Sequence, residues 1–349
     1  DDVKALCAAV AKHRRGEIVL LGVVCNGGHQ ARERARLART LLLHLDCTAI
    51  PVGMGSLGKP YEPKQHEYQL PGYDQVRDED LSDGMELLLR LLRAAELHSI
   101  TFLMISAMTD FAQLIRDEPE LVIQKVRHVC AMGGLQKNAA GEWEPDTAVN
   151  NMWDLEAAQL MYHFCFEQAI PMSVISRNAV PNLPMKLAKD CAAQDPNNTI
   201  LQYLVNAQQL GLTGLWQNLC AGKLPARCTK RWYMATFCGV EDADFDVDAL
   251  DQTADITSFL NGSVKPYDVC ALMLALPNAH STFALQPYRE SSGDVTHSFF
   301  LDAANMVDVN QVAALLRTTF RETVRLARCS SFTLQAGQEL LGVRTEKNV

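Results

Sequence analysis

Residues 17–25 read EIVLLGVVC and are followed at once by NGG at residues 26–28. An unbroken apolar run that ends in a glycine-containing loop is typical of a strand buried on both faces, as in a parallel sheet. Residues 30–45 then carry leucines at helical spacing with arginines on the opposite side, and a second short apolar run ends in glycine at residues 48–55. We therefore predict that the chain begins by alternating strand and helix.

The same alternation continues along the chain. It predicts a mostly parallel, open α/β sheet with helices on both faces, in one domain over residues 1–330 with a polar tail at 331–349. Residues 56–83, rich in Pro, Gly, Tyr and charge, form a long loop. The further expected strands are 100–106, 126–132, 171–175 and, partly antiparallel, 281–286 and 296–301. The further expected helices are 84–97, 108–116, 118–126, 154–168, several within 183–222, 268–276 and 312–326.

Composition narrows the classes of protein that this chain can represent. The 349 residues carry a formal net charge of −9, which argues against a nucleic-acid binder, and no run of 18 apolar residues predicts a membrane span. The chain opens on two acids and not on a signal peptide, so we expect a cytoplasmic protein. Eleven cysteines without CxxC spacing read as small buried side chains in a reducing compartment and argue against structural zinc.

Ligands of such sheets bind at the carboxyl ends of the strands. The loop NGGH at residues 26–29 lies at one such end and resembles a phosphate cradle, but it lacks the GxGxxG pattern and a ribose-binding acid. Arg32, Arg36 and Arg39 share one helix face beside it. They are either a solvated face or contacts for a phosphate.

Several polar residues stand at the expected starts of helices, and each allows two interpretations. Asp1-Asp2 precede an apolar helical run, either as an N-cap with a solvated neighbour or as metal carboxylates. Asp268 is likewise a cap or a metal-facing carboxylate. Tyr267 beside it either contacts a ligand or fills a gap.

The segment NNMWDLEAA at residues 150–158 gives the clearest ligand signal. Asp154 is a natural N-cap for the following helix, so its presence has a structural explanation. Asn150 and Asn151 have no such duty, and their amides can donate and accept hydrogen bonds toward a hydroxylated ligand.

Six segments, in matching order, resemble the inosine–uridine nucleoside hydrolase family. They are DDVKAL at 1–6 (the second half of DxDxxxDDxxAL), MISAMTD at 104–110 with PEL at 119–121 (GPLTNLA…PEL), AMGG at 131–134 (MGG), NNMWDLEAA at 150–158 (NxxxDPEAA), YDVCA at 267–271 (the histidine–aspartate before a late helix), and ESSG at 290–293 through FLD at 300–302 (ExxG…TxG…D).

The resemblance implies a calcium ion, which takes six to eight oxygen ligands, gripping the hydroxyls of a ribose. Carried over by position, Asp2, Asp268 and the carbonyl of Ile105 would be metal ligands. Asp1 and Asn150 would hydrogen-bond ribose hydroxyls. In the family an aspartate deprotonates the water that attacks an oxocarbenium-like sugar carbon.

The remaining site residues also follow from the resemblance. Tyr267 stands where the family has its leaving-group histidine, so Asp1, Asn150 and Tyr267 are the expected catalytic residues. Asn26 or His29 stands for the strand-end asparagine, and Asn151 lies beside the ribose. Trp232 and Tyr233 either stack on a nucleobase or belong to the core.

The chain departs from the family pattern in ways that resemble one branch of it. The family's first aspartate would precede Asp1, Ala148 replaces a glutamate, and residues 56–83 replace the usual HGxxGL loop. These departures resemble the XopQ-type effectors that plant-pathogenic bacteria inject into host cells by type III secretion.

Three functions therefore stand at this point. The first is a calcium-dependent N-ribosyl hydrolase acting on a nucleoside or related molecule. The second is a weakly active or inactive binder of ADP-ribose. The third is contact with host proteins through residues 56–83 or the tail. The family commonly forms dimers or tetramers, and the sequence leaves the oligomeric state open.

Overall fold

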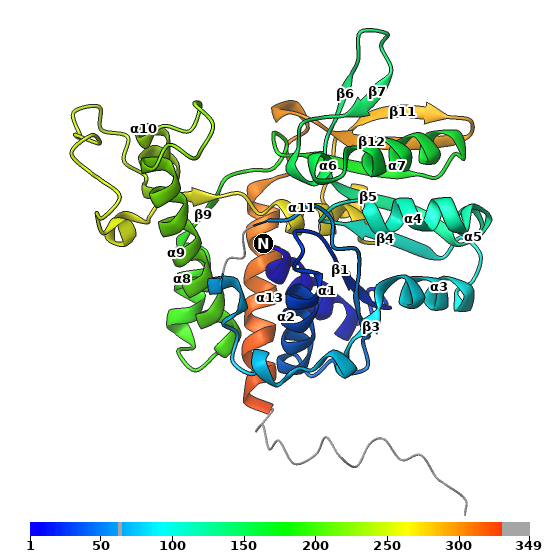
Figure 1. The fold of residues 1–349 in the computed structure, drawn as a ribbon, viewed down its shortest axis with the longest axis horizontal. Coiled ribbons are helices and arrows are strands. Elements are labelled where there is room, and N and C mark those ends of the chain that lie inside the picture. The colour runs from blue at the N-terminus through cyan, green and yellow to red at the C-terminus, as the bar shows by residue number, and fades with distance from the viewer. Residues whose placement is uncertain (62–64, 330–349) are drawn as a thin grey trace, which may run out of the picture.

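The core of the computed structural model is a five-stranded sheet in the order β11-β12-β8-β5-β4 (Figure 1). Strands β4, β5, β8 and β12 are parallel, and only β11 is antiparallel to its neighbour. A separate parallel sheet has the order β1-β2-β3, and two short antiparallel ribbons pair β6 with β7 and β9 with β10. The expected mostly parallel α/β architecture is confirmed.

The structure describes residues 1–61 and 65–329, so the predicted tail at 331–349 lies outside the described residues. The strands are β1 (Val23–Cys25), β2 (Val52–Met54), β3 (Ser82–Asp83), β4 (Ile100–Met104), β5 (Val126–Gly133), β6 (Leu135–Lys137), β7 (Trp143–Pro145), β8 (Met172–Ser176), β9 (Leu183–Pro184), β10 (Ser263–Val264), β11 (Tyr288–Ser292) and β12 (Val295–Phe300). The α-helices are α1 (Asp2–Arg14), α2 (Ala31–His44), α3 (Gly84–Ala94), α4 (Thr109–Asp117), α5 (Pro119–Lys125), α6 (Val149–Trp153), α7 (Leu155–Glu167), α8 (Lys186–Gln194), α9 (Thr199–Cys220), α10 (Lys230–Tyr233), α11 (Tyr267–Ala275), α12 (Ala279–Thr282) and α13 (Val309–Cys329).

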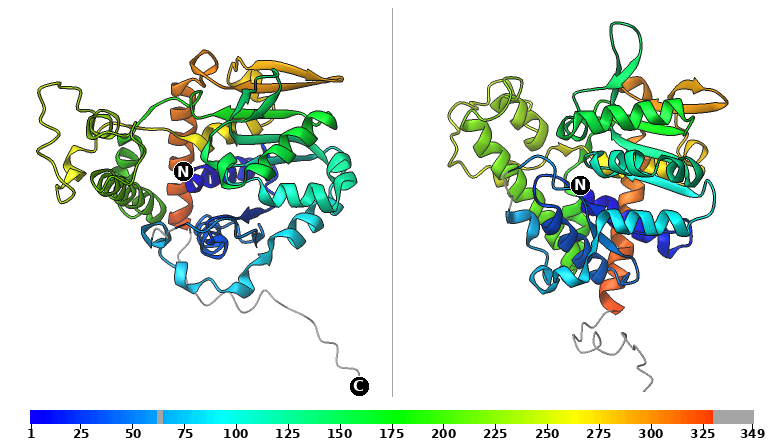
Figure 2. Two further views of the ribbon diagram at one scale, coloured as in Figure 1. Left: turned by 45° about the horizontal axis from the view of Figure 1, so that its top comes forward. Right: turned by 45° about the vertical axis from the view of Figure 1, so that its right-hand side comes forward.

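Helices cover both faces of the five-stranded sheet, as the apolar strands require. Alternate residues of a strand point to opposite faces. Val129 and Ala131 of β5 accordingly pack in one cluster with α4 and α7, whereas Cys130 and Met132 pack in another with α1 and α11. The views in Figure 2 show these helix layers on the two sides of the sheet.

The strand predicted at residues 17–25 is much shorter than expected. Only Val23–Cys25 pairs, with β2, and Val19 and Leu21 are 73% and 40% exposed. Strand β1 is the outer strand of its small sheet, and no described strand pairs with its other side. Apolar sequence alone does not keep a segment in a sheet, because each strand also needs a hydrogen-bonding neighbour.

Two further expectations are corrected. The strand expected at 281–286 is replaced by α12 and a loop, and the antiparallel pair β11–β12 lies at 288–300 instead. The hairpin β6–β7 has no counterpart among the expected strands. It packs back on the sheet through the Trp143 ring, which lies 5.1 Å from Phe299 while its Nε1 donates to Glu290 Oε2 (2.9 Å).

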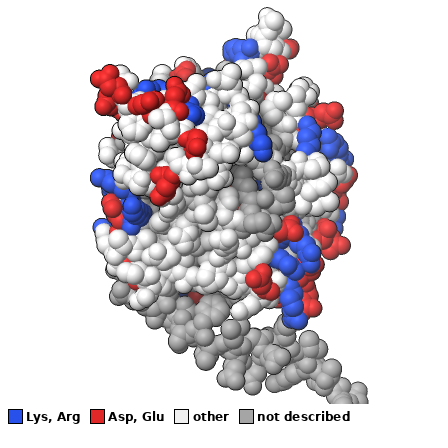
Figure 3. Space-filling view, turned by 60° about the vertical axis from the view of Figure 1, so that its left-hand side comes forward, with Lys and Arg blue, Asp and Glu red and all other residues white. Residues whose placement is uncertain are grey.

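The chain leaves the five-stranded sheet after β8 and rejoins it at β11, and the ribbon of β9 and β10 joins the two ends of an excursion between them. Helix α9 carries this excursion outward, to a second, smaller core around Trp216, Tyr233 and Ile256 (Figure 1, left). Figure 3 shows the side of the molecule toward this excursion, where acidic side chains gather at the upper left and no continuous basic patch is visible.

The expectations about membrane spans and about the cysteines can be compared with the structure. Within the described ranges, no helix combines the length and apolarity needed to cross a bilayer. The cysteines whose side chains are described are free thiols and most are buried, as expected for small apolar side chains. Burial raises the pKa of Cys7 and of Cys25 to about 12.

Candidate functional site

The loops that follow β1 and β2 stay hydrogen-bonded to each other beyond the strands. Gly27 N donates to the Ser56 carbonyl (2.9 Å), and His29 N donates to the Leu57 carbonyl (2.8 Å). Gly28 forms an isolated parallel bridge with Pro60. Residues 56–60, the first part of the long predicted loop, are therefore ordered and lie beside the end of β1. We call these residues the wall.

Asn26, directly after β1, is held by the loop that follows β4 and by the first turn of α4. Its Nδ2 donates to the Ala107 carbonyl (3.0 Å) and to Asp110 Oδ2 (2.5 Å). Asp110 Oδ1 also accepts from Ser56 N (2.7 Å). These bonds bring together the carboxyl ends of β1 and β4, which belong to different sheets, and they place Asn26 where a ligand of this fold class would lie.

Gly27 is required by its contact with an aromatic side chain. Its φ of +82° favours glycine, and a Cβ there would lie 2.5 Å from the Trp153 ring. The Trp153 ring also lies 6.0 Å from the Tyr61 ring and 5.0 Å from the Arg34 guanidinium. The loop after β1, the wall and α6 thus meet at one partly buried aromatic group.

Asn150 and Asn151 lie at the carboxyl end of β5, as their sequence position suggested. Asn150 Nδ2 donates to the Met132 carbonyl (2.8 Å) and its side chain is partly exposed. Asn151 is fully buried, and its Nδ2 donates to the Gly134 carbonyl (2.9 Å) and to Asp146 Oδ1 (3.1 Å). Asn151 therefore supports the turn after β5, and Asn150 is the one that can meet a ligand.

Asp1, Asp2 and Asp268 converge where helices α1 and α11 begin. Asp1 Oδ2 accepts from Asp268 N (3.2 Å), so Asp1 caps α11 and not its own helix. Asp1 and Asp2 are exposed, whereas Asp268 is only 6% exposed. Burial raises the pKa of the Asp268 carboxyl well above its usual range, and the charge of Asp2 raises it further.

This carboxylate group suits a hard cation only in part. Over residues 1–61 and 65–329, no group of three or more His, Cys, Asp or Glu side chains is placed to hold a metal ion. Asp2 and Asp268 are nonetheless two neighbouring carboxylates whose charges disfavour each other, and a bound cation would relieve that repulsion. The pair therefore fits two of the oxygen ligands of a calcium ion, and Ile105, partly buried after β4, is the third predicted contributor.

Tyr267, the first residue of α11, lies beside this group. It is half-buried, and burial raises the pKa of its hydroxyl, while the charges of Arg177 and Arg227 act in the opposite direction. The Lys265 ammonium donates to the Arg177 carbonyl (2.7 Å), which connects the end of β8 to the start of α11. The basic groups near Tyr267 were not singled out in the sequence.

Trp232 and Tyr233 lie in the outlying core. Tyr233 is fully buried, its hydroxyl donates to the Leu212 carbonyl (2.9 Å), and its ring packs 5.1 Å from that of Trp216. Trp232 is partly buried and meets the Phe237 ring edge-on at 5.4 Å. Both contacts correspond to the core alternative, and the structure does not bring Tyr233 to the strand ends.

The predicted phosphate contacts are engaged by the protein itself. The N–H groups of Gly27 and His29 bond the wall, as described above. Arg32 and Arg36 both pair with Asp78 Oδ1 (2.7 and 3.1 Å), and Arg39 donates to the Thr48 carbonyl (2.8 Å). Arg32 and Arg36 therefore fasten the segment after β2 to α2, which the sequence could not show because Asp78 is distant in the chain.

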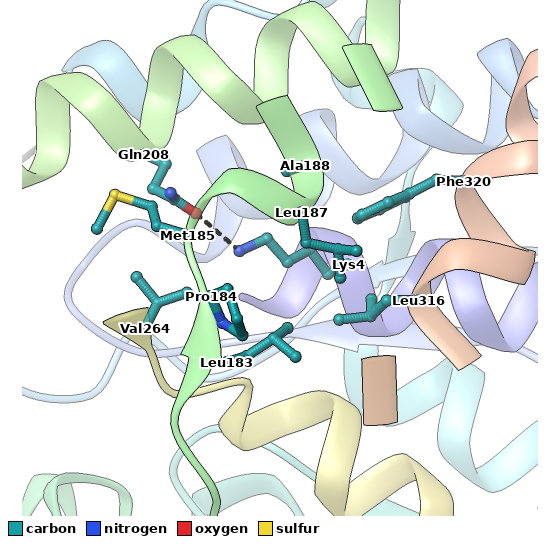
Figure 4. Close-up of a pocket in the computed structure, with 10 residues that line it drawn as sticks. All are labelled: Lys4, Leu183, Pro184, Met185, Leu187, Ala188, Gln208, Val264, Leu316 and Phe320. Atoms are coloured by element: carbon teal, nitrogen blue, oxygen red, sulfur yellow. Dashed lines mark hydrogen bonds between the residues drawn. The ribbon is translucent and has the colours of Figure 1, made fainter. Parts of the chain in front are cut away.

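Lys4 lies one turn after the acidic pair, in an apolar pocket between α1 and α8 (Figure 4). Its Nζ donates to Gln208 Oε1 (3.1 Å), and the cavity of about 10 Å³ has room for one water. Burial lowers the pKa of Lys4, and the nearby Asp268 charge opposes this. The side chain joins the start of α1 to the excursion helix α9.

Three residues of the site were missed from the sequence: Asp110, Asp146 and Arg34. Asp110 falls inside a quoted segment, but its partners Asn26 and Ser56 lie more than 50 positions away. Arg34 donates to the Asn26 carbonyl (2.6 Å) from the first turn of α2, on a different helix face from Arg32, Arg36 and Arg39. An acid two residues into a helix that follows a strand end is a signal that would have found Asp110.

The chain was compared with family models, curated sequences and solved structures. The model of inosine-uridine preferring nucleoside hydrolases matches residues 1–339. No match was found among curated protein sequences. The crystal structure of the type III effector protein XopQ complexed with adenosine diphosphate ribose is 22% identical with a TM-score of 0.73, covering 93% of this chain and 90% of that one.

Other solved structures share the same fold. That of the effector protein XOO4466 is 23% identical with a TM-score of 0.74, covering 93% of this chain and 90% of that one. The purine-preferring ribonucleoside hydrolase from Gardnerella vaginalis is 14% identical with a TM-score of 0.57, covering 94% of this chain and 97% of that one. At these identities the likeness concerns the fold.

Proposed function

This chain belongs to the inosine-uridine preferring nucleoside hydrolase family, and from that membership we propose that it binds a ribose-containing small molecule and hydrolyses its N-ribosidic bond with the help of a divalent cation. The observation that carries the proposal is the convergence of Asp1, Asp2 and Asp268 at two helix N-termini. Carboxylates placed this way bind hydroxyl hydrogens and a hard cation, which are the two things that ribose chemistry needs.

We assign the ribose contacts to residues by their position in the site. Asp1 is exposed and accepts hydrogen bonds, so it holds a ribose hydroxyl, and Asn150 holds another from the end of β5. We propose that Asn26, and with it His29, contact the ligand from the side of residues 56–60. Fixed polar groups that position the sugar lower the barrier because the geometry is prepared before reaction.

Asp2, Asp268 and the carbonyl of Ile105 would hold the cation, for which we propose calcium. When bound, it would orient the ribose hydroxyls and acidify a water. Hydrolysis forms a bond from the water oxygen to the anomeric carbon and breaks the carbon–nitrogen bond, whose electron pair leaves with the base. The attacking water loses one proton to solvent, and the leaving base takes up one. We propose that Tyr267, whose hydroxyl has a pKa raised by burial, donates that proton to the base and regains one from solvent.

The direct test measures binding and turnover together. Calorimetry with ADP-ribose, in calcium and in chelator, should show binding that weakens about tenfold or more without the cation. Release of free ribose from a nucleoside panel should depend on Asp268. An Asp268→Ala protein that binds and turns over like the wild type would sink the proposal, and Asp294→Ala, exposed and remote in sequence, is the matched control.

One observation favours a second candidate function, a binder of ADP-ribose with little turnover. Tyr267 stands where a leaving group needs an acid, and a tyrosine whose pKa is raised by burial gives up its proton reluctantly. In that case ADP-ribose binds in calorimetry while no ribose is released from any nucleoside. The replacement Tyr267→His should then increase ribose release, and unchanged release would argue against this explanation.

We also propose that the protein acts in the cytosol of a host cell after type III secretion. The support is the shared fold with the effectors XopQ and XOO4466. A translocation assay with a reporter fused to the full chain tests it, since a signal that persists in a secretion-deficient strain would exclude this route.

A further inference from the structure

Asp110 makes an unusual set of contacts for a residue in the first turn of a helix. Its two carboxylate oxygens accept from Asn26 Nδ2 (2.5 Å), from Ser56 N (2.7 Å) and from Ser56 Oγ (3.2 Å). The backbone of Gly55 lies so close that a Cβ there would come within 2.8 Å of Asp110 Oδ2. One carboxylate therefore binds both the end of β1 and the start of the wall after β2.

These contacts determine which end of the Asn26 side-chain amide remains available to bind a ligand. The NH₂ group has two hydrogens, and both are used, by Asp110 and by the Ala107 carbonyl (3.0 Å). The carbonyl oxygen Oδ1 is buried and has no hydrogen-bond partner among the described residues, and the whole side chain is 7% exposed. A buried acceptor without a donor costs free energy that a ligand donor can recover.

Without the carboxylate, this orientation would not be unique. The oxygen and nitrogen of an asparagine amide have nearly the same shape, so only the surrounding hydrogen bonds decide which points where. An accepting carboxylate can bond only the NH₂ end, which leaves the oxygen for the ligand. A neutral amide at position 110 offers a donor as well as an acceptor and permits both orientations.

We propose that Asp110 is a positioning residue that presents the Asn26 carbonyl oxygen to the ligand, so that the site selects a ribose with a free hydroxyl at that point over the corresponding deoxyribose. The inference rests on the proposed function, since it assigns a sugar-selecting role within the same site. It goes beyond that function because Asp110 itself touches no ligand and acts through Asn26.

The test compares three ligands by calorimetry: ADP-ribose and its analogues lacking the 2-hydroxyl or the 3-hydroxyl of the terminal ribose. The wild type should bind one analogue about tenfold more weakly than ADP-ribose, the loss expected for one hydrogen bond to a buried acceptor. Asp110→Asn should weaken ADP-ribose binding by a similar factor and leave the binding of that analogue within about twofold, so that the part of the discrimination that depends on Asn26 is lost. Asp117→Asn, the same change on an exposed residue of the same helix, should alter neither value.

Two further variants separate positioning from folding. Asn26→Ala removes the acceptor and should remove the part of the discrimination that Asn26 contributes, even if Asp110→Asn does not fold. Ser56→Ala removes only the 3.2 Å bond and should keep it. Circular dichroism melts establish that each variant tested is folded.

The outcomes are distinct. Equal weakening of all three ligands by Asp110→Asn shows a purely structural role and overturns the inference. A wild type that binds ADP-ribose without distinguishing the deoxy sugars also overturns it, as does an Asn26→Ala protein that discriminates as strongly as the wild type. A wild type that binds no ADP-ribose refutes the proposed function instead.

Discussion

A buried histidine in the five-stranded sheet makes the stability of the protein depend on pH. His128 of β5 is largely buried, and its Nε2 lies 3.0 Å from Ser173 Oγ on the neighbouring strand. Burial lowers the pKa of His128 to about 4, and the charges of Arg127, His280 and His297 lower it further. The neutral ring is therefore the form that the folded protein stabilises.

This histidine predicts a loss of stability in mild acid. A folded pKa of about 4, below the unfolded value of 6.5, means that the unfolded chain binds the proton first. Stability is complete above the unfolded pKa and falls as the pH drops, by about 2 kcal/mol between pH 7.5 and pH 5. Urea unfolding at the two pH values measures it, and His128→Gln should remove that part of the difference. An unchanged difference in His128→Gln would contradict the assignment.

At the same scale, the sequence predicted those site residues whose partners are close in the chain. Asp154 caps α7 as expected, with Ala157 N at 3.1 Å, because a cap contacts its own first turn. The strand-end positions of Asn26 and Asn150 were also visible. The partners of Asp110 and Arg32 lie far along the chain, and no local pattern shows such pairings.

Among the elements, helix α9 connects the two cores. Its N-cap is Asn198, which is fully buried and whose Oδ1 accepts from Leu201 N (3.0 Å). The first two turns pack Ile200 and Leu204 into the main core, and Trp216 near the other end belongs to the outlying one. The cap therefore fixes the direction in which the excursion leaves.

Removing this cap should destabilise the protein. Asn198→Ala leaves the first N–H groups of α9 without an acceptor, and we expect a loss of about 1–2 kcal/mol in the free energy of unfolding. Asn198→Ser, which keeps a cap, should recover most of it. Denaturant unfolding of both proteins, with Asn218→Ala on the exposed side of the same helix as control, makes the comparison. A loss equal in the control would show that the cap is not the cause.

Elements were predicted well where length and periodicity agreed and poorly at sheet edges. Helices α7 and α11 and strands β5 and β8 lie within one or two residues of their expected bounds. Strand β1 was overextended because its apolar residues, in sequence, look the same as those of a paired strand. The hairpin β6–β7 was missed because its stability comes from Trp143 packing on Phe299, over 150 positions away.

The whole molecule contains hydrophobic clusters of unequal size. The two clusters on the faces of the five-stranded sheet are large, whereas the one around Trp216, Tyr233 and Ile256 contains few buried residues. Long exposed loops surround the small cluster, between α10 and β10. Local stability follows the amount of buried apolar contact.

Backbone amides in the large and the small clusters should therefore exchange hydrogen at different rates. We expect backbone amides of β5 and β8 to be the most protected, and those of residues 228–260 to exchange at least about tenfold faster. Exchange followed by mass spectrometry of the native protein measures both regions in one experiment. Equal protection of the two would mean that they unfold as a single unit.

Helix α9 also has a mechanical consequence. Its 22 residues span about 33 Å, and it is rooted in the main core at one end only. The rooted end packs on α8 and α13. A tilt of the helix by about 5° at that end moves its far end by about 3 Å. Substitutions at that root can therefore change where α10 stands relative to the strand ends without altering any residue of the sheet.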